Sequence, residues 1–255
     1  MSAPDRGWMR KRLRPALFAL LLLAWCALAL QSAILLRIAL MAWVDPASTT
    51  FQRSEIVRLL VEKQRIAWSQ QWVDGARIST HLQRAVIAAE DADFAGHAGV
   101  DWEAIDQARQ RNERAHRQAQ RRAQRRGAPT APARLRGGST ITQQLAKNLL
   151  LSGERTVQRK GQELLLAWML ELLLDKRRIL ELYLNHVEWG EGIFGAQAAA
   201  RHYFRVDADR LSPSQAARLA VMLPAPKRFE RQPGSGYLQA RAATILARMP
   251  AVELP

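Results

Sequence analysis

The stretch GGSTITQQLAKNLLLSGERTVQRKGQE, residues 137–163, gathers polar and cationic side chains around the start of a predicted helix. Thr140 and Gln143 have the spacing of a capping box, and Lys147 follows one helical turn later on the same side. A helix N-terminus presents free backbone N–H groups, and a neighbouring ammonium group adds positive charge, so this side of the helix is suited to bind a phosphate. Further cations follow at Arg155, Arg159 and Lys160.

Glu163 stands one turn after Arg159, and Leu164–Ala167 follow it, so this carboxylate enters an apolar helix. A carboxylate in such a place is either paired with a cation or raised in pKa. An i,i+4 ion pair with Arg159 is the simplest interpretation, and it requires no catalytic role.

A second stretch, RAVIAAEDADFAGHAGVDW at residues 84–102, places acids and a histidine directly after an apolar run. Glu90 and Asp91 end that run, and Phe94 and His97 follow within the next six residues. Such groups form either the polar end of an ordinary helix or the wall of an active site. The residues by themselves leave both interpretations open.

Charge divides the chain into two basic segments and a nearly neutral remainder. Of the formal net charge of +15, residues 1–14 hold about +4 and residues 107–136 about +9. The second segment contains almost no large apolar side chains, so we expect a mobile, solvated insertion there. It also lacks interleaved aromatic residues, and with the near-neutral remainder this argues against a nucleic-acid partner.

The N-terminal region predicts one membrane span. Residues 15–36 carry no charge and are long enough to cross a bilayer as a helix, and apolar character continues to Val44. The cationic flank predicts a cytoplasmic basic tail over residues 1–14, a signal-anchor helix over 15–44 and an exported domain over 45–255. The alternative is a cleaved signal peptide, but the apolar run is too long for one. A second leucine-rich run, residues 164–174, is too short to span and predicts a helix buried in a soluble core.

Helical periodicity predicts an all-α exported domain. Ser212 as N-cap, Pro213 at the first helical position and Gln215 mark one helix start. No run alternates cleanly at period two, so no strand is expected. The expected helices cover residues 52–68, 81–90, about a dozen residues from Ser139, 156–174, 176–187 and 212–223, with 101–126 either a long polar helix or a disordered arm.

Four motifs follow one another along the chain: AAEDADFAGHAGVD, GGSTITQQLAKN, RKGQELLLAWMLE and RRILELYLNHVEWGEGIFGAQAAARHYF. Together they resemble the family-51 peptidoglycan glycosyltransferases, and among them the monofunctional transglycosylases. The resemblance covers roughly residues 50–250. It implies a lysozyme-like helical domain and polymerisation of lipid II into β-1,4 glycan strands, with inversion and loss of undecaprenyl diphosphate. No transpeptidase domain is expected, because no sequence follows residue 255.

The resemblance also implies roles for individual residues. Glu90 would be the base that takes the proton from the 4-hydroxyl of the acceptor sugar, and Glu163 would orient the reacting groups or help hold the diphosphate. A divalent ion, Mg²⁺ or Mn²⁺, is compatible with that second role. The diphosphate-binding residues would be Thr140, Gln143, Gln144, Lys147, Arg155, Arg159 and Lys160, and the supporting residues Asp91, Phe94, His97 and Asn185.

The implied partners are lipid II, the growing glycan strand and the bacterial inner membrane, with the catalytic domain in the periplasm. Other cell-wall synthesis proteins are compatible partners. Three alternatives stand beside this interpretation. A lytic, lysozyme-like enzyme would leave Lys147 and Arg155 without a purpose. A membrane-tethered module that binds nucleic acid or a partner through residues 107–136 is disfavoured by the missing aromatic residues and the near-neutral remainder. A metal-binding Asp91-Ala92-Asp93 motif would need a nucleotide-binding pattern that the sequence lacks.

Overall fold

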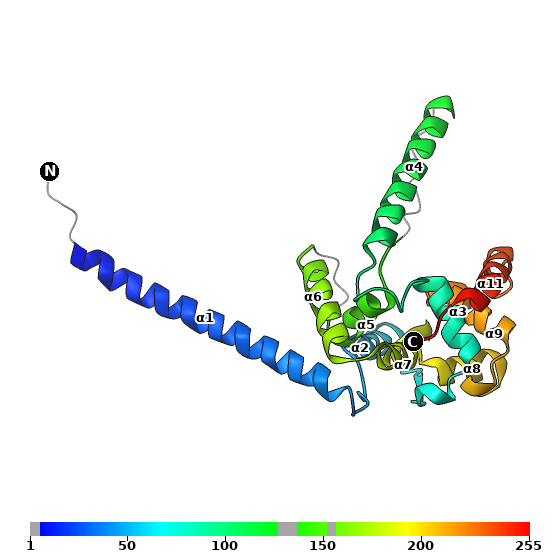
Figure 1. The fold of residues 1–255 in the computed structure, drawn as a ribbon, viewed down its shortest axis with the longest axis horizontal. Coiled ribbons are helices and arrows are strands. Elements are labelled where there is room, and N and C mark those ends of the chain that lie inside the picture. The colour runs from blue at the N-terminus through cyan, green and yellow to red at the C-terminus, as the bar shows by residue number, and fades with distance from the viewer. Residues whose placement is uncertain (1–5, 127–136, 152–156) are drawn as a thin grey trace. The chain divides into compact units, whose positions relative to one another are not determined.

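The computed structural model describes residues 6–126, 137–151 and 157–255 of the chain, which forms two compact units, residues 1–44 and 45–255. The first unit is the helix α1 (Arg6–Leu40) (Figure 1). Within it, Leu17–Leu40 are long and apolar enough to cross a membrane. These 24 residues rise about 36 Å, against a hydrocarbon thickness of about 30 Å. The helix ends at Leu40, four residues before the predicted end of the span, and residues 41–43 form a turn.

The second unit is helical, with one small sheet. Its helices are α2 (Thr50–Lys63), α3 (Thr80–Glu90), α4 (Trp102–Arg126), α5 (Ile141–Leu150), α6 (Val157–Leu173), α7 (Lys176–His186), α8 (Ala196–Phe204), α9 (Pro213–Met222), α10 (Pro226–Glu230) and α11 (Gly236–Arg248), with short 3₁₀ turns η1 (Gly75–Arg77), η2 (Ala208–Arg210) and η3 (Met249–Ala251). The fold is all-α in class, as the sequence predicts.

The sheet was not expected from the sequence. Strands β1 (Ser69–Gln70), β2 (Glu188–Gly190) and β3 (Ile193–Phe194) pair in the order β1-β3-β2, with β3 parallel to β1 and antiparallel to β2. Strands of two or three residues are too short to show a period-two pattern, which is why the sequence did not reveal them.

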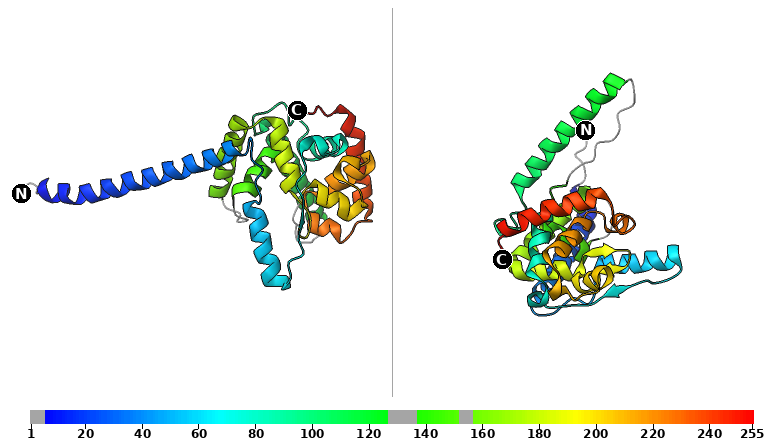
Figure 2. Two further views of the ribbon diagram at one scale, coloured as in Figure 1. Left: turned by 90° about the horizontal axis from the view of Figure 1, so that it is seen from below. Right: turned by 90° about the vertical axis from the view of Figure 1, so that its right-hand side faces the viewer.

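The helices of the second unit form two groups. Helix α5 packs against α2, α6 and α7, while α9 packs against α3 and α11. In Figures 1 and 2 these groups lie side by side, and the chain passes from α7 to α9 through the β2–β3 hairpin, α8 and η2. Helix α3 and helix α5 therefore bring residues of both groups to the boundary between them.

Two helix starts follow the predicted capping chemistry. At α5, the Thr140 side chain accepts from the Gln143 N–H, and the Gln143 side chain accepts from the Thr140 N–H. At α9, Ser212 and Gln215 form the same reciprocal pair, with Pro213 at the first helical position. Both capping boxes predicted from the sequence are confirmed.

The structure decides between the alternatives for residues 101–126 and changes the expectation for residues 164–174. Of the two alternatives for residues 101–126, the structure has the helix, α4, which projects away from the rest of its unit (Figures 1 and 2). Residues 127–136 of the predicted insertion lie outside the described residues. The expectation of a fully buried helix at 164–174 was wrong for one face of α6, because Leu165, Trp168 and Leu172 are 41%, 52% and 79% exposed. Only the opposite face, with Leu166, Ala167 and Leu170, enters the core.

Candidate active site

Glu90 is the last residue of α3, and the apolar face of that helix anchors it. Leu82, Val86 and Ile87 are buried in the core, while Glu90 itself is half-buried. Burial raises the pKa of Glu90 above its ordinary value of 4.5, although the hydrogen bond from Gln144 and the charge of Arg241 oppose this. A carboxylate in this position is a stronger base than an exposed glutamate.

Gln144 of α5 connects Glu90 to the other helix group. Its Nε2 donates to Glu90 Oε2 at 2.8 Å, and its Oε1 accepts from the hydroxyl of Tyr183 at 3.0 Å. Tyr183 belongs to α7 and is buried. Three elements therefore determine the position of one carboxylate.

The loop after Glu90 is attached to the start of α5 by Asp91. Its Oδ2 accepts from the backbone N–H of Ile141 at 2.9 Å, and its Oδ1 lies 2.9 Å from His97 Nε2. Burial alone would lower the pKa of His97, but the contact with Asp91 outweighs it and raises that pKa above its ordinary value. His97 therefore braces the loop in the structure, and it lies against Asp91 instead of Glu90.

This arrangement bears on the predicted role of the α5 N-terminus. Two of the N–H groups that were expected to bind phosphate already have partners in the protein, because Ile141 donates to Asp91 and Gln143 to Thr140. Thr140 and Gln143 are buried, and the Thr140 hydroxyl donates to the carbonyl of Gly99 at 2.6 Å. Thr140 and Gln143 hold the start of α5 in place, and the Asp91 carboxylate lies at this helix start, where a phosphate was expected.

A second set of contacts holds the same loop from α6 and α7. Lys176 donates to the carbonyl of His97 at 2.6 Å and to Glu171 at 2.8 Å, and its ammonium group lies 4.5 Å from the centre of the buried Phe94 ring. Gly99 has φ +83°, and a Cβ there would lie 2.9 Å from Glu171 Cγ. The glycine of this motif is therefore required both by its backbone conformation and by the close approach of α6.

Cationic residues gather beside Glu163 on α6. Glu163 is 3% exposed, and its carboxylate accepts from Arg159 at 3.0 Å and from Lys160. Lys160 also donates to Ser139 Oγ at 3.3 Å. The predicted i,i+4 ion pair is thus present, but it is buried and involves a second cation. Arg155, the remaining predicted cation, lies outside the described residues.

Lys147 lies within electrostatic range of both glutamates. Burial lowers its pKa, while the charges of Glu163 and Glu90 oppose that change. Its ammonium group forms no hydrogen bond or ion pair with any residue that the structure describes. A half-buried cation without such a partner is available to an anionic ligand.

The side chains around Glu163 do not form a site for a divalent ion by themselves. The Glu163 oxygens are engaged by two cations, and no group of three His, Cys, Asp or Glu side chains suited to a metal occurs among the residues described. Asp91 is likewise engaged at both oxygens, so the Asp91-Ala92-Asp93 motif does not present a ligand pair.

On α7 the residue that reaches Gln144 is not the one that the sequence indicated. Asn185 was expected to support the site, but it is fully buried and pairs with the backbone N–H and carbonyl of Val73. Tyr183, two residues earlier, is the α7 side chain that reaches Gln144. The sequence also did not indicate Arg241 of α11, whose charge acts on Glu90. Neither residue has a local sequence signal, because both reach the site only through helix packing.

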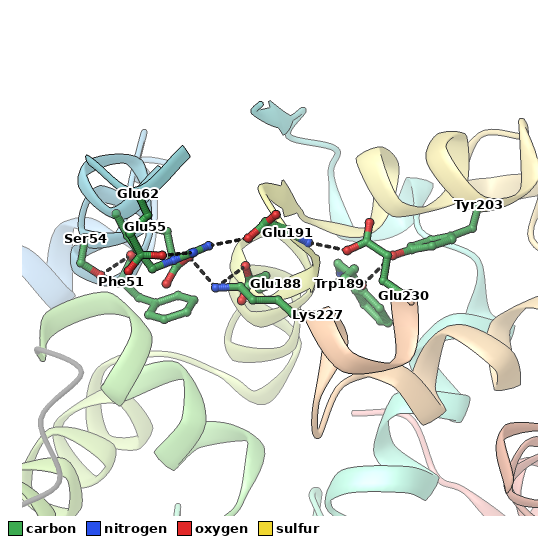
Figure 3. Close-up of polar contacts among 11 residues, drawn as sticks. Phe51, Ser54, Glu55, Glu62, Glu188, Trp189, Glu191, Tyr203, Lys227 and Glu230 are labelled. Atoms are coloured by element: carbon green, nitrogen blue, oxygen red, sulfur yellow. Dashed lines mark hydrogen bonds and ion pairs between the residues drawn. The ribbon is translucent and has the colours of Figure 1, made fainter. Parts of the chain in front are cut away.

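A second charge cluster, in which Glu55 and Glu188 are buried and Glu62 is exposed, lies among α2, α10 and the β2–β3 hairpin (Figure 3). Arg58 pairs with Glu55 at 2.8 Å, with Glu62 at 2.9 Å and with Glu191 at 3.1 Å. Lys227 joins Glu55 at 2.5 Å and Glu188 at 3.3 Å. We call these six residues the α2–α10 cluster. Within it, burial raises the pKa of Glu188 to about 7.

Comparison with known proteins identifies close relatives. A family profile described as Transglycosylase matches residues 59–250. The biosynthetic peptidoglycan transglycosylase of Bordetella pertussis is 50% identical over 214 residues, which cover 84% of this chain and 84% of that protein. The protein of the same name from Burkholderia thailandensis is 48% identical over 257 residues, covering 99% of this chain and 94% of that protein. That of Burkholderia vietnamiensis is 50% identical over 232 residues, covering 91% and 87%. The profile match includes Glu90, Gln144, Lys147 and Glu163.

Proposed function

The chain belongs to the transglycosylase family and is a peptidoglycan transglycosylase, and from this premise we propose that its substrate is lipid II. The product would be a β-1,4-linked glycan strand, formed with inversion at the donor C1 and release of undecaprenyl diphosphate. The observation that carries the proposal is a half-buried Glu90, held by a neutral amide, near the ammonium group of Lys147, which pairs with no residue among those described.

In the proposed step, Glu90 removes the proton from the 4-hydroxyl of the acceptor sugar. The oxygen forms a bond to C1 of the donor as the bond between C1 and the diphosphate oxygen breaks, and the electron pair leaves with the diphosphate. The raised pKa of Glu90 supports this role, since it brings the carboxylate closer to the ideal range for a base near neutral pH. The Gln144 N–H keeps the ionised form available by donating to it.

The leaving diphosphate needs positive charge more than it needs a proton, because it is already a good leaving group. Lys147 is placed to supply that charge, and Arg159 and Lys160 stand near it around Glu163. We assign Glu163 the task of holding these two cations in position. Arg155 is proposed as a further diphosphate contact, from its place in the motif. If a divalent ion takes part, it would screen the diphosphate charge.

The membrane is the proposed location of the reaction. One apolar N-terminal helix, α1, is compatible with a single-pass anchor, and lipid II is itself a membrane lipid. The cationic residues before the span, Arg6, Arg10, Lys11, Arg12 and Arg14, favour a cytoplasmic N-terminus. We propose that the chain resides in the inner membrane with its catalytic unit in the periplasm. The lack of transpeptidase activity stays a prediction.

The test is incubation of the purified full chain with lipid II in detergent. We expect glycan polymer and one undecaprenyl diphosphate released for each bond formed, with β-1,4 linkages in the product. A protein that leaves lipid II unchanged but cleaves isolated glycan strands would be the lytic enzyme of the alternative interpretation, and the proposal would fail.

A further inference from the structure

We propose that Tyr183 is a positioning residue for the reaction, which sets the orientation of the Gln144 amide so that its N–H groups face Glu90. The inference rests on the proposed role of Glu90 as the base and goes beyond it, because it concerns a residue that need not touch the substrate. It depends on two hydrogen bonds in series, from Tyr183 to Gln144 and from Gln144 to Glu90.

The orientation of a glutamine amide is decided by its partners, since its two ends are nearly equal in size. An ionised Glu90 has only acceptor oxygens, so it is satisfied by the Gln144 Nε2 end, which lies 2.8 Å away. The opposite end of the amide then presents Oε1 to α7. Tyr183 meets this oxygen with a hydroxyl at 3.0 Å, and the hydroxyl has one proton to donate.

The reversed amide would be costly because of where Tyr183 lies. The residue is 1% exposed, and Gln144 Oε1 is the acceptor for its hydroxyl in the described part of the chain. With the amide reversed, the buried O–H would have no acceptor, and Oε1 would face the Glu90 carboxylate. Burial and the charge of Glu90 also raise the pKa of Tyr183 well above its ordinary value, so the phenol keeps its proton and remains a donor.

The consequence for catalysis is a bias toward the basic form of Glu90. A fixed N–H donor stabilises the carboxylate relative to the carboxylic acid, so the base stays ionised in surroundings that would otherwise favour its protonation. Without the Tyr183 hydroxyl, the amide can present its oxygen to Glu90, which favours the protonated form. Tyr183 therefore acts on the ionisation of the base through Gln144.

The chain offers a matched control for the removal of one tyrosine hydroxyl. Tyr203 of α8 also donates a 3.0 Å hydrogen bond, to the carbonyl of Trp189, beside the α2–α10 cluster (Figure 3). The experiment compares Tyr183→Phe with Tyr203→Phe in lipid II polymerisation, measuring kcat/KM from pH 4.5 to 8.5 and the thermal unfolding of each protein. We expect Tyr183→Phe to shift the acidic limb of the plot of kcat/KM against pH to higher pH, by about half to one pH unit. Tyr203→Phe should leave the limb in place.

Three further variants separate this proposal from the proposed function. In a Gln144→Met protein the amide is absent, so adding Tyr183→Phe should produce no further shift of the limb. An unshifted limb in Tyr183→Phe, or an equal further shift in the Gln144→Met background, would overturn the positioning role. Glu90→Gln tests the base itself, since a fully active Glu90→Gln protein would refute the role of Glu90 whatever Tyr183 does. A shift of the limb that Tyr203→Phe matches would show a general effect of packing and would also overturn the proposal.

Discussion

The active site and the α2–α10 cluster both bring charged side chains together, but they differ in the partners that these side chains have. In the α2–α10 cluster, Arg58 contacts three glutamates and Lys227 contacts two (Figure 3). In the active site, Glu90 is held by a neutral amide, and Lys147 forms no hydrogen bond or ion pair with a described residue.

The difference indicates what each region is for. A buried ion pair offsets the cost of removing its two charges from water, and losing one partner exposes the other to that full cost. In the α2–α10 cluster every carboxylate contacts Arg58 or Lys227, so the cluster can hold α2, α10 and the β2–β3 hairpin together, although burial still raises the pKa of Glu188 to about 7. In the active site no described residue pairs with Lys147, and the diphosphate of the donor would supply a negative partner for its charge.

The largest expected effect comes from removing the base. Glu90→Gln keeps the size of the side chain and its place beside Gln144, so folding and lipid II binding should stay close to wild type. Polymerisation should fall by about 10²–10⁴-fold, the usual contribution of a general base. The measurement is the initial rate of polymer formation together with thermal unfolding. A wild-type rate would remove Glu90 from its role.

Lys147→Ala should have the next largest effect. It removes a charge-assisted contact to the diphosphate, worth about 1.5–3 kcal/mol, so kcat/KM should fall by about ten- to a hundredfold. Lys147→Arg should recover part of the loss, because the positive charge matters more than the shape of the donor at a point contact. The exposed Lys63 of α2 provides the control, and its replacement by alanine should leave kcat/KM unchanged. Unaltered turnover and unaltered binding of a diphosphate analogue in Lys147→Ala would contradict the assignment.

The arginines of α4 should have a smaller effect that depends on the membrane. Arg109 and Arg117 have strongly exposed side chains, and each arginine close to an anionic bilayer contributes about 1 kcal/mol. Replacing five arginines by glutamine should raise KM by about tenfold in anionic vesicles, with little change in detergent and a smaller effect at high salt. The five are Arg117, Arg121, Arg122, Arg125 and Arg126.

The matched control for α4 replaces the same five residues by lysine, which keeps the charge. An equal loss of activity in neutral detergent would place α4 in the active site. No change under any condition would show that the segment is only solvated.

The smallest effect on activity is expected from the α2–α10 cluster, where Glu188→Gln should change stability alone. The pKa of Glu188 is raised to about 7, so between pH 4.5 and 7 the folded protein holds a proton that the unfolded chain has lost. The free energy of unfolding therefore falls as pH rises through this window. Glutamine stays neutral, so the Glu188→Gln protein should not lose this stability. The difference in free energy of unfolding between Glu188→Gln and wild type should therefore be about 1–3 kcal/mol more favourable to the variant at pH 8 than at pH 4.5, and polymerisation at pH 7 should be unchanged. A variant that is less stable than wild type at pH 8 would show that the ion pair with Lys227 dominates.

The sequence predicted the features that depend on neighbours along the chain. Helix periodicity, the Thr140–Gln143 capping box and the Arg159–Glu163 pair all arise within four residues, and the structure contains each of them. The family motifs also led to Glu90 and Lys147. Local chemistry of this kind can be read from spacing because a helix places residues three and four apart on one face.

The contacts that define the active site instead join residues that are far apart along the chain. Asp91 meets the N–H of Ile141 fifty residues away, and Tyr183 meets Gln144 across 39 residues. The choice between Tyr183 and Asn185 on α7 depends on which side of the helix faces α5, and spacing cannot decide that. That Asp91 occupies part of the α5 N-terminus, where a phosphate was expected, could not be predicted for the same reason.

The pH dependence of lipid II polymerisation tests the central claim most directly, because it reports the ionisation of the base. The pKa of Glu90 is raised above 4.5 by burial, so kcat/KM should fall as pH drops through that raised value, when Glu90 gains a proton and can no longer accept one. Arg241→Gln should move this acidic limb to higher pH, because the arginine charge favours the carboxylate. A rate that stays constant down to pH 4.5, or a limb that Arg241→Gln moves to lower pH, would contradict the account.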